Sequence, residues 1–208
     1  MNTAVAILLP AVAPALAGFL LLTFREPKKQ GIVTVYTAQA LVLTVILLAV
    51  CLFAADGEVT VGYLMRQVPV SFRADGLGKT FALVVVVIWM LTGFFSFSYL
   101  KEGKRQKRFY GFYLIVCGLL IALSFAGNLV TFYVFYELTT LCSMLLVLHE
   151  QTRAAVMAGL KYLLYSFCGA YMALFGLYVV WQYAGTHAFT GKGTLDPALV
   201  SGHEGILL

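Results

Sequence analysis

The stretch Phe81-Ala-Leu-Val-Val-Val-Val-Ile-Trp-Met-Leu-Thr-Gly-Phe-Phe-Ser-Phe-Ser-Tyr-Leu100 decides the fold of this chain. It contains no charged side chain from end to end. Because an α-helix rises about 1.5 Å per residue, a helix of this length crosses the roughly 30 Å hydrocarbon core of a bilayer. We therefore predict a membrane-spanning helix over residues 81–100.

Similar apolar runs occupy most of the remaining sequence. Apolar residues make up 62% of the chain and charged residues only 11%, whereas soluble domains have roughly 45–50% and roughly 25%. This composition excludes an ordinary soluble fold. It predicts an all-α membrane protein, residues 1–208 forming one transmembrane domain of about six helices. The expected spans are Ala4–Thr23, Ile32–Ala55, Phe81–Leu100, Phe109–Ala126, Leu129–Leu148 and Ala155–Tyr183.

The first run resembles a signal peptide in length, but its flanks differ. No positive charge precedes it, and it contains Pro10 and Pro14. Secretory signal peptides begin with a basic segment. We expect this run to be retained as the first helix.

The net charge of +5 reports membrane orientation, since most basic residues lie in short loops beside the predicted helix ends. Basic loops face the cytoplasm in multi-pass proteins. We therefore predict an inner (cytoplasmic) membrane protein with both its N-terminus and its C-terminal tail outside, and no nucleic-acid partner. The loop residues that carry this prediction are Arg25, Lys28, Lys29, Lys101, Lys104, Arg105, Lys107, Arg108 and Arg153.

The longest internal loop runs from Asp56 to Lys79 on the predicted outer side. It contains Glu58-Val-Thr-Val-Gly62 and Val68-Pro-Val-Ser-Phe72, two short β-branched segments separated by turn residues. Such a pattern is typical of a β-hairpin. We expect a small hairpin on the outer face.

Nothing in the sequence indicates a metal, a cofactor or a redox centre. Cys51, Cys117, Cys142 and Cys168 fall singly in apolar runs, with no CxxC pair. They are interpreted as small buried apolar residues. His149 ends the fifth span without a second histidine at that depth, so a surface position is favoured over haem ligation. No catalytic residue is predicted.

Glu137 lies near the middle of the fifth predicted span. A carboxylate at that depth costs several kcal/mol unless it is protonated, paired or hydrated, and such residues often mark ion pathways. Tyr133, Glu137 and Thr140 share one helix face, which forms a possible polar path. The alternative is a structural ion pair or hydrogen bond that only fixes helix packing.

Lys161 is the second charged residue inside a predicted span, with Tyr165 one turn further on the same face. Counting from the turn near Gln151 at 1.5 Å per residue, Glu137 and Lys161 differ in axial position by about 8 Å. The two side chains could therefore pair directly or through one water, and a coupled pair of this kind can capture or release a proton. The alternative is that the Lys161 ammonium snorkels to the membrane surface.

Further along this span, Gly169, Ala173 and Gly176 present a face of small residues that suits close helix contact.

Three stretches resemble one family, the antiporter-like proton-translocating subunits of complex I, of membrane-bound hydrogenases of the formate hydrogenlyase type and of multisubunit cation/proton antiporters. The stretches are Phe72-Arg-Ala-Asp-Gly-Leu77, then Asn128-Leu-Val-Thr-Phe-Tyr-Val-Phe-Tyr-Glu137-Leu with Ser143-Met-Leu-Leu-Val147, and Ala158-Gly-Leu-Lys161-Tyr-Leu. By this resemblance, Glu137 matches the family's essential glutamate and Lys161 the lysine of some sixth helices.

The sequence also departs from the family pattern. Where certain complex I members carry Arg-x-Gly-Asp, this chain has Phe167-Cys-Gly-Ala170, which favours the hydrogenase-type or quinone-type relatives. Family members have about fourteen helices, so the chain resembles the N-terminal six-helix part of such a subunit.

The resemblance implies a proton- or sodium-translocating membrane subunit of a redox-driven complex, in contact with other membrane subunits and indirectly with peripheral redox subunits. Its redox chemistry would belong to other chains, so whether this chain counts as an enzyme is left open. The alternative is a structural membrane anchor without an ion path of its own. The sequence does not distinguish H⁺ from Na⁺.

Overall fold

A computed structural model describes residues 3–24, 31–54, 56–64, 68–100, 105–184 and 186–189. Six helices in this part of the chain are long and apolar enough to cross a membrane. The basic loop residues Arg25, Lys28, Lys29, Lys101 and Lys104 lie outside the described residues, as do the outer-loop Arg66 and the tail with Lys192. The prediction of a mostly helical membrane protein with about six spans is confirmed.

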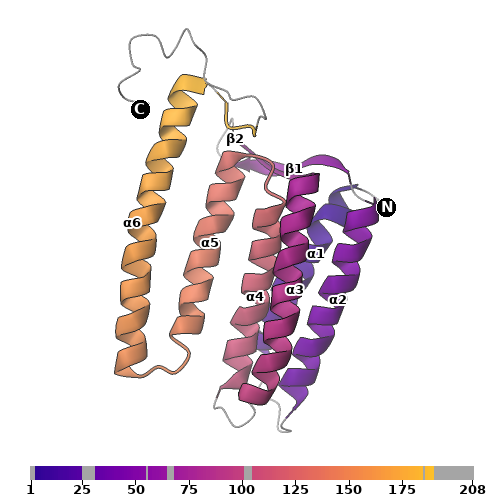
Figure 1. Ribbon diagram of the computed structural model, residues 1–208, viewed down its shortest axis with the longest axis vertical. Coiled ribbons are helices and arrows are strands. Elements are labelled where there is room, and N and C mark those ends of the chain that lie inside the picture. The colour runs from indigo at the N-terminus through magenta and orange to yellow at the C-terminus, as the bar shows by residue number, and fades with distance from the viewer. Residues whose placement is uncertain are drawn as a thin grey trace.

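Along the described part of the chain, two helices are followed by two strands and then by four further helices (Figure 1). Helix α3 begins five residues before the predicted span and α6 extends slightly beyond its predicted limits at both ends. The elements are α1 (Thr3–Thr23), α2 (Ile32–Ala54), β1 (Gly57–Leu64), β2 (Val68–Ala74), α3 (Gly76–Tyr99), α4 (Gln106–Ser124), α5 (Leu129–Val147) and α6 (Arg153–Ala184).

Asp75 explains the early start of α3. Its carboxylate accepts a hydrogen bond of 2.7 Å from the backbone N–H of Gly78 and so caps the helix. The same carboxylate pairs with Arg73 at 2.9 Å. Capping satisfies backbone donors that a helix otherwise leaves free at its first turn, so the helix includes Gly76 to Thr80 before its apolar run begins.

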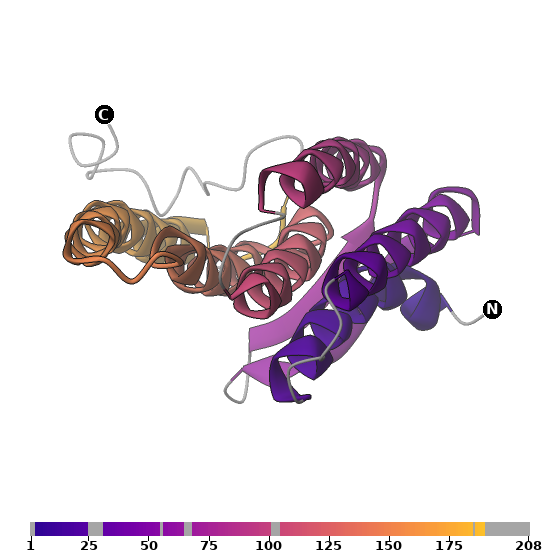
Figure 2. The same ribbon diagram turned by 90° about the horizontal axis from the view of Figure 1, so that it is seen from below.

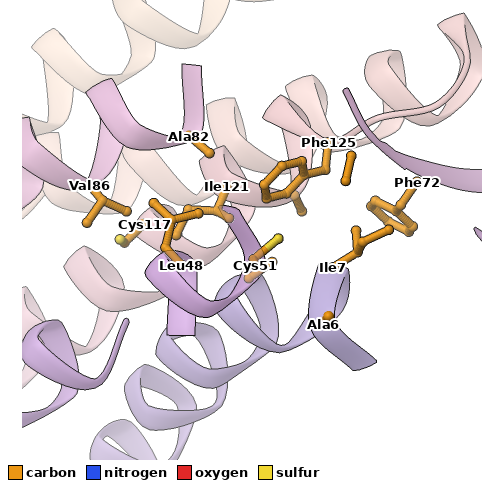
Figure 3. Close-up of a cluster of buried hydrophobic side chains, with 13 residues drawn as sticks. Ala6, Ile7, Leu48, Cys51, Phe72, Ala82, Val86, Cys117, Ile121 and Phe125 are labelled. Carbon is orange, nitrogen blue, oxygen red and sulfur yellow. The ribbon is translucent and has the colours of Figure 1, made fainter. Parts of the chain in front are cut away.

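Helix α4 forms the centre of the bundle. Half of the residues in its most apolar 18-residue segment are buried, whereas only 6% are buried in the corresponding segment of α6. The buried cluster in Figure 3 joins α4 to its neighbours through Cys117, Ile121 and Phe125, against which Ile7 of α1 and Leu48 of α2 pack.

Helices α1 and α4 approach each other closely because glycines lie at their contact. A Cβ atom on Gly118 would lie 2.8 Å from the Cβ of Ala15 and closer still to the Ala11 carbonyl oxygen. A Cβ on Gly18 would collide with the Gly111 carbonyl in the same way. Small residues permit such close backbone packing in membrane helices.

Strands β1 and β2 form an antiparallel hairpin with an irregularity between Thr60 and Gly62. Figure 1 shows the hairpin across one end of the bundle, next to the α4–α5 turn. The Arg73 N–H donates to the Phe125 carbonyl at 2.7 Å, and the Gly127 N–H donates to the Ser71 carbonyl at 2.8 Å. A hairpin is therefore present, and its position on the outer face of the membrane stays a prediction from loop charge.

Helix α6 lies at the edge of the bundle beside α5, as both views show (Figures 1 and 2). Its buried residues are Gly159 and Ala170 alone among those described. After α6, the chain returns to the start of α5, where the Leu129 N–H donates to the His187 carbonyl at 2.9 Å. Helix α6 thus presents most of its circumference outward.

Candidate functional site

Helix α5 positions Glu137. The helix begins where Asn128, in an extended conformation, accepts a hydrogen bond of 2.8 Å from the Thr131 N–H through its side-chain oxygen. From this cap, the helix rises about 1.5 Å per residue. Glu137 therefore lies about midway along α5, which ends at Val147.

Glu137 lies in a half-buried position. Its Oε1 atom is buried and has no hydrogen-bond partner among the described residues. Tyr133, one turn earlier, interacts electrostatically with this carboxylate. A buried carboxylate oxygen without a partner is costly and calls for a specific explanation, such as a catalytic role or a bound water or ion.

The remaining hydroxyls near Glu137 bond within their own helix. Thr140 is buried and donates to the Tyr136 carbonyl at 3.1 Å. Thr139 donates to the Phe135 carbonyl at 2.7 Å. The predicted face of Tyr133, Glu137 and Thr140 thus exists. Thr140 gives its proton to the backbone, and Tyr133 is the hydroxyl that interacts with the Glu137 carboxylate, through charge and a side-chain hydrogen bond.

Lys161 and Tyr165 both lie on the exposed part of α6. Lys161 makes no ion pair within 4.0 Å in the described part of the chain. The ion pairs found there, Arg73–Asp75 and Lys79–Asp56, belong to the hairpin end. The structure therefore does not bring Lys161 and Glu137 into direct contact.

A hydrogen bond of 2.7 Å between Ser143 on α5 and Tyr162 on α6 sets the relative height of the two helices. Glu137 lies six residues from Ser143, and in the antiparallel partner the matching position is Cys168. Lys161 is seven residues from that level, so its axial offset from Glu137 is about 10 Å. This value is close to the offset of about 8 Å expected from the sequence.

Two hydroxyl residues of α3 form hydrogen bonds within their own helix. Thr92 and Ser96 bond to backbone carbonyls on their own helix, as membrane hydroxyls commonly do. They also contact Tyr113 and Tyr110 of α4.

The cysteines differ in exposure. Cys51 and Cys117 are buried, as expected, and Cys142 is half-buried. Cys168 is exposed, because α6 is covered by α5 on one side only. No group of three or more metal-ligating side chains occurs in the described residues.

His149 is less exposed than the sequence suggested. It follows α5, lies edge-on to Phe109 at a ring separation of 5.3 Å, and has a buried Nδ1 atom without a partner among the residues that the structure describes. Burial, together with the charge of Arg108, lowers the pKa of His149.

The glycines of the predicted small-residue face of α6, Gly169 and Gly176, do not meet another helix closely in the described part of the structure. A Cβ atom on Gly169 or Gly176 would find no neighbour within 4 Å. Ala173 and Gly176 instead line a shallow apolar groove between α5 and α6, together with Phe132, Tyr133 and Tyr136. The predicted close contact therefore does not involve α5.

Two features of the structure were not predicted from the sequence. The Ser143–Tyr162 bond depends on the rotation of both helices, which helix periodicity alone does not fix. The Asp75 cap had a local signal, an aspartate directly before a helical apolar run, but the expected start at Phe81 overlooked it.

Six apolar helices and a carboxylate held within one of them define a multi-pass membrane protein with a candidate ion-binding group. Residues 126–205, which include Glu137 and Lys161, match the family described as NADH:quinone oxidoreductase/Mrp antiporter, transmembrane.

Relatives and a solved structure agree with this match. NADH-quinone oxidoreductase subunit N of Brevibacillus brevis is 32% identical over 64% of this chain and 27% of its own length. A probable K(+)/H(+) antiporter subunit of Rhizobium meliloti is 27% identical over 89% of this chain and 19% of its own. A chain of the archaeal membrane-bound sulfane sulfur reductase superposes with a TM-score of 0.71 at 16% identity, over 95% of this chain and 41% of that one.

The chain is similar to antiporter-like membrane subunits, most clearly over residues 126–205. It spans well under half of the length of each of these relatives. The solved structure, at 16% identity, supports the fold.

Proposed function

We propose that this chain is a proton- or sodium-translocating membrane subunit of a redox-driven energy-converting complex. Relatives named as antiporter subunits and as part of NADH-quinone oxidoreductase support this assignment. Other membrane subunits of the complex are its partners, and peripheral redox subunits act on it indirectly.

Glu137 is the observation that carries the proposal. One of its carboxylate oxygens is buried in the middle of a membrane helix and has no hydrogen-bond partner in the described residues. Carboxylates within membrane helices are costly and mark ion pathways. Lys161, about 10 Å away along the axis, then acts on Glu137 through an intervening water or through a change in helix position.

We further propose that the six helices form the N-terminal portion of a larger antiporter-like subunit. The length of the relatives and the exposed face of α6 support this arrangement. Tyr165 and Tyr171 are 76% and 69% exposed. Hydroxyl groups within the membrane favour protein or water over acyl chains, so further helices on this face would provide a more favourable environment.

The test replaces Glu137 by Gln in the assembled complex. Glutamine keeps the shape of the side chain but cannot titrate. Ion translocation in proteoliposomes should fall by at least about tenfold, equivalent to about 1.4 kcal/mol in the barrier, while assembly and redox activity of the peripheral subunits persist. Glu150→Gln, at an exposed position after α5, is the matched control.

The alternative function, a structural anchor without an ion path, makes the opposite prediction. A Glu137→Gln complex that assembles and translocates ions at the normal rate would support the anchor and exclude Glu137 from the ion path. An effect equal to that of Glu150→Gln would lead to the same conclusion.

A further inference from the structure

The contact between α5 and α6 is apolar both near the α5–α6 turn and towards the hairpin. At the turn end, Leu148 packs against Gly159, where a Cβ atom would lie 2.6 Å from the leucine Cδ2. Towards the hairpin, the two helices border the apolar groove lined by Ala173 and Gly176. Apolar contacts are non-directional, so they fix the position of one helix along the other less specifically than a hydrogen bond does.

A polar contact interrupts this apolar interface. The hydroxyls of Ser143 and Tyr162 are 2.7 Å apart, and both side chains are half-buried. Ser143 also donates to the Thr140 carbonyl at 3.0 Å. Because Ser143 uses its proton there, Tyr162 donates to Ser143, which gives the pair a defined direction and geometry.

The position of this pair relates it to the two charged residues. Tyr162 directly follows Lys161 in the sequence, and Ser143 lies on the same helix as Glu137. A slip of α6 by one helical turn, about 5.4 Å, would change the axial offset of Lys161 from Glu137 from about 10 Å to about 5 Å or about 16 Å. The height at which α6 is held on α5 therefore controls how strongly the two charges interact.

We propose that Ser143 and Tyr162 form a positioning pair that holds α6 in register on α5 and so fixes the separation of Lys161 from Glu137. This inference rests on the proposed function insofar as Glu137 and Lys161 serve an ion path. The register itself is a structural property and can be measured independently.

The test uses the assembled complex with single variants Ser143→Ala and Tyr162→Phe, the double variant, and Ser143→Thr. Nitroxide spin labels at the exposed positions Leu138 and Leu164 report the distance between α5 and α6. Ion translocation is measured on unlabelled samples of each variant. Tyr178→Phe removes an exposed hydroxyl from the same helix and is the matched control.

Each single variant should shift or broaden the measured distance distribution and lower translocation about three- to tenfold, as expected for one hydrogen bond in a membrane protein. The double variant should be no worse than either single variant, because the two hydroxyls act as one unit. Ser143→Thr retains the hydroxyl and should restore both readouts. Tyr178→Phe should change neither.

An unchanged distance distribution in Ser143→Ala and Tyr162→Phe would overturn the positioning role, whatever happens to translocation. Strictly additive losses in the double variant, or a failure of Ser143→Thr to restore the distance, would overturn the pair as a unit. A changed distance with normal translocation would show that the register does not serve the ion path. If Glu137→Gln has no effect, the proposed function fails, but the distance measurement still decides the register.

Discussion

The side-chain amide of Asn128 donates a hydrogen bond of 2.8 Å to the backbone carbonyl of Pro69, which joins the start of α5 to the hairpin. The same amide donates to the Ser71 hydroxyl at 3.0 Å, while its oxygen caps α5. Asn128 is buried. One side chain therefore fixes the height of the helix that carries Glu137 relative to the end of the bundle.

Replacing Asn128 by Ala should lower the free energy of unfolding by about 1 to 3 kcal/mol. The change removes a helix cap and leaves the Pro69 carbonyl and the Ser71 hydroxyl without this donor. Thermal unfolding of the purified protein in detergent measures the effect. Gln39→Ala removes an amide from an exposed position on α2 and should have almost no effect; equal losses in the two variants would contradict the role of Asn128.

Gly118→Ala should weaken the contact between α1 and α4. The added methyl group meets backbone and Ala15 atoms of α1 that cannot move aside, and overpacking of this kind costs about 1 to 3 kcal/mol. Gly176→Ala is the matched control, since a Cβ there meets nothing within 4 Å. Alanine also favours helix over glycine, so Gly176→Ala should unfold at the same or a slightly higher temperature than the parent protein.

The fold was largely predictable because a membrane-spanning helix leaves a strong signal in the sequence of its own residues. Each helix needs a long apolar run, and a single charged residue such as Glu137 stands out within one. Capping residues carry a weaker signal, so the predicted start of α3, at Phe81, was five residues later than its observed start at Gly76. Helix α5, by contrast, begins at Leu129, where the sequence indicated it.

The arrangement around Glu137 was less predictable, because it depends on helix rotation as well as helix position. Residue spacing predicted the scale of the axial offset to Lys161, since the rise per residue is constant. Spacing could not show that Lys161 lies on the exposed part of α6. Nor could it single out Tyr162, the neighbouring residue, as the one that contacts α5.

The stability of the protein should fall in mild acid because of His149. Burial, then the charge of Arg108, lower the pKa of this histidine below its ordinary value of 6.5. The folded state therefore binds a proton less readily than the unfolded state, so stability is present above pH 6.5 and is lost as the pH falls through the pKa of the folded protein. His187, whose pKa burial also lowers, contributes with the same sign.

The measurement is the melting temperature of the parent protein and of His149→Gln between about pH 7.5 and about pH 5.5. Glutamine cannot gain a proton, so the variant should lose less stability over this range than the parent protein. Some pH dependence should persist through His187. Identical pH profiles for the two proteins would contradict a role for His149.

Variants of Lys161 distinguish two roles that its positive charge could have in an ion path with Glu137. A lysine can release its proton when its surroundings favour the neutral form, whereas an arginine stays charged. If Lys161 takes up and releases the transported proton, Lys161→Gln and Lys161→Arg should both lower ion translocation by at least about tenfold. If it acts only as a fixed charge, Lys161→Arg should translocate normally and Lys161→Gln should not.

Arg153→Gln, at the first residue of α6, controls for a general loss of positive charge at this end of the helix. Normal translocation by both Lys161 variants would show that the Lys161 ammonium extends to the membrane surface and takes no part in the ion path. Glu137 would then be the charged residue through which α5 and α6 contribute to that path.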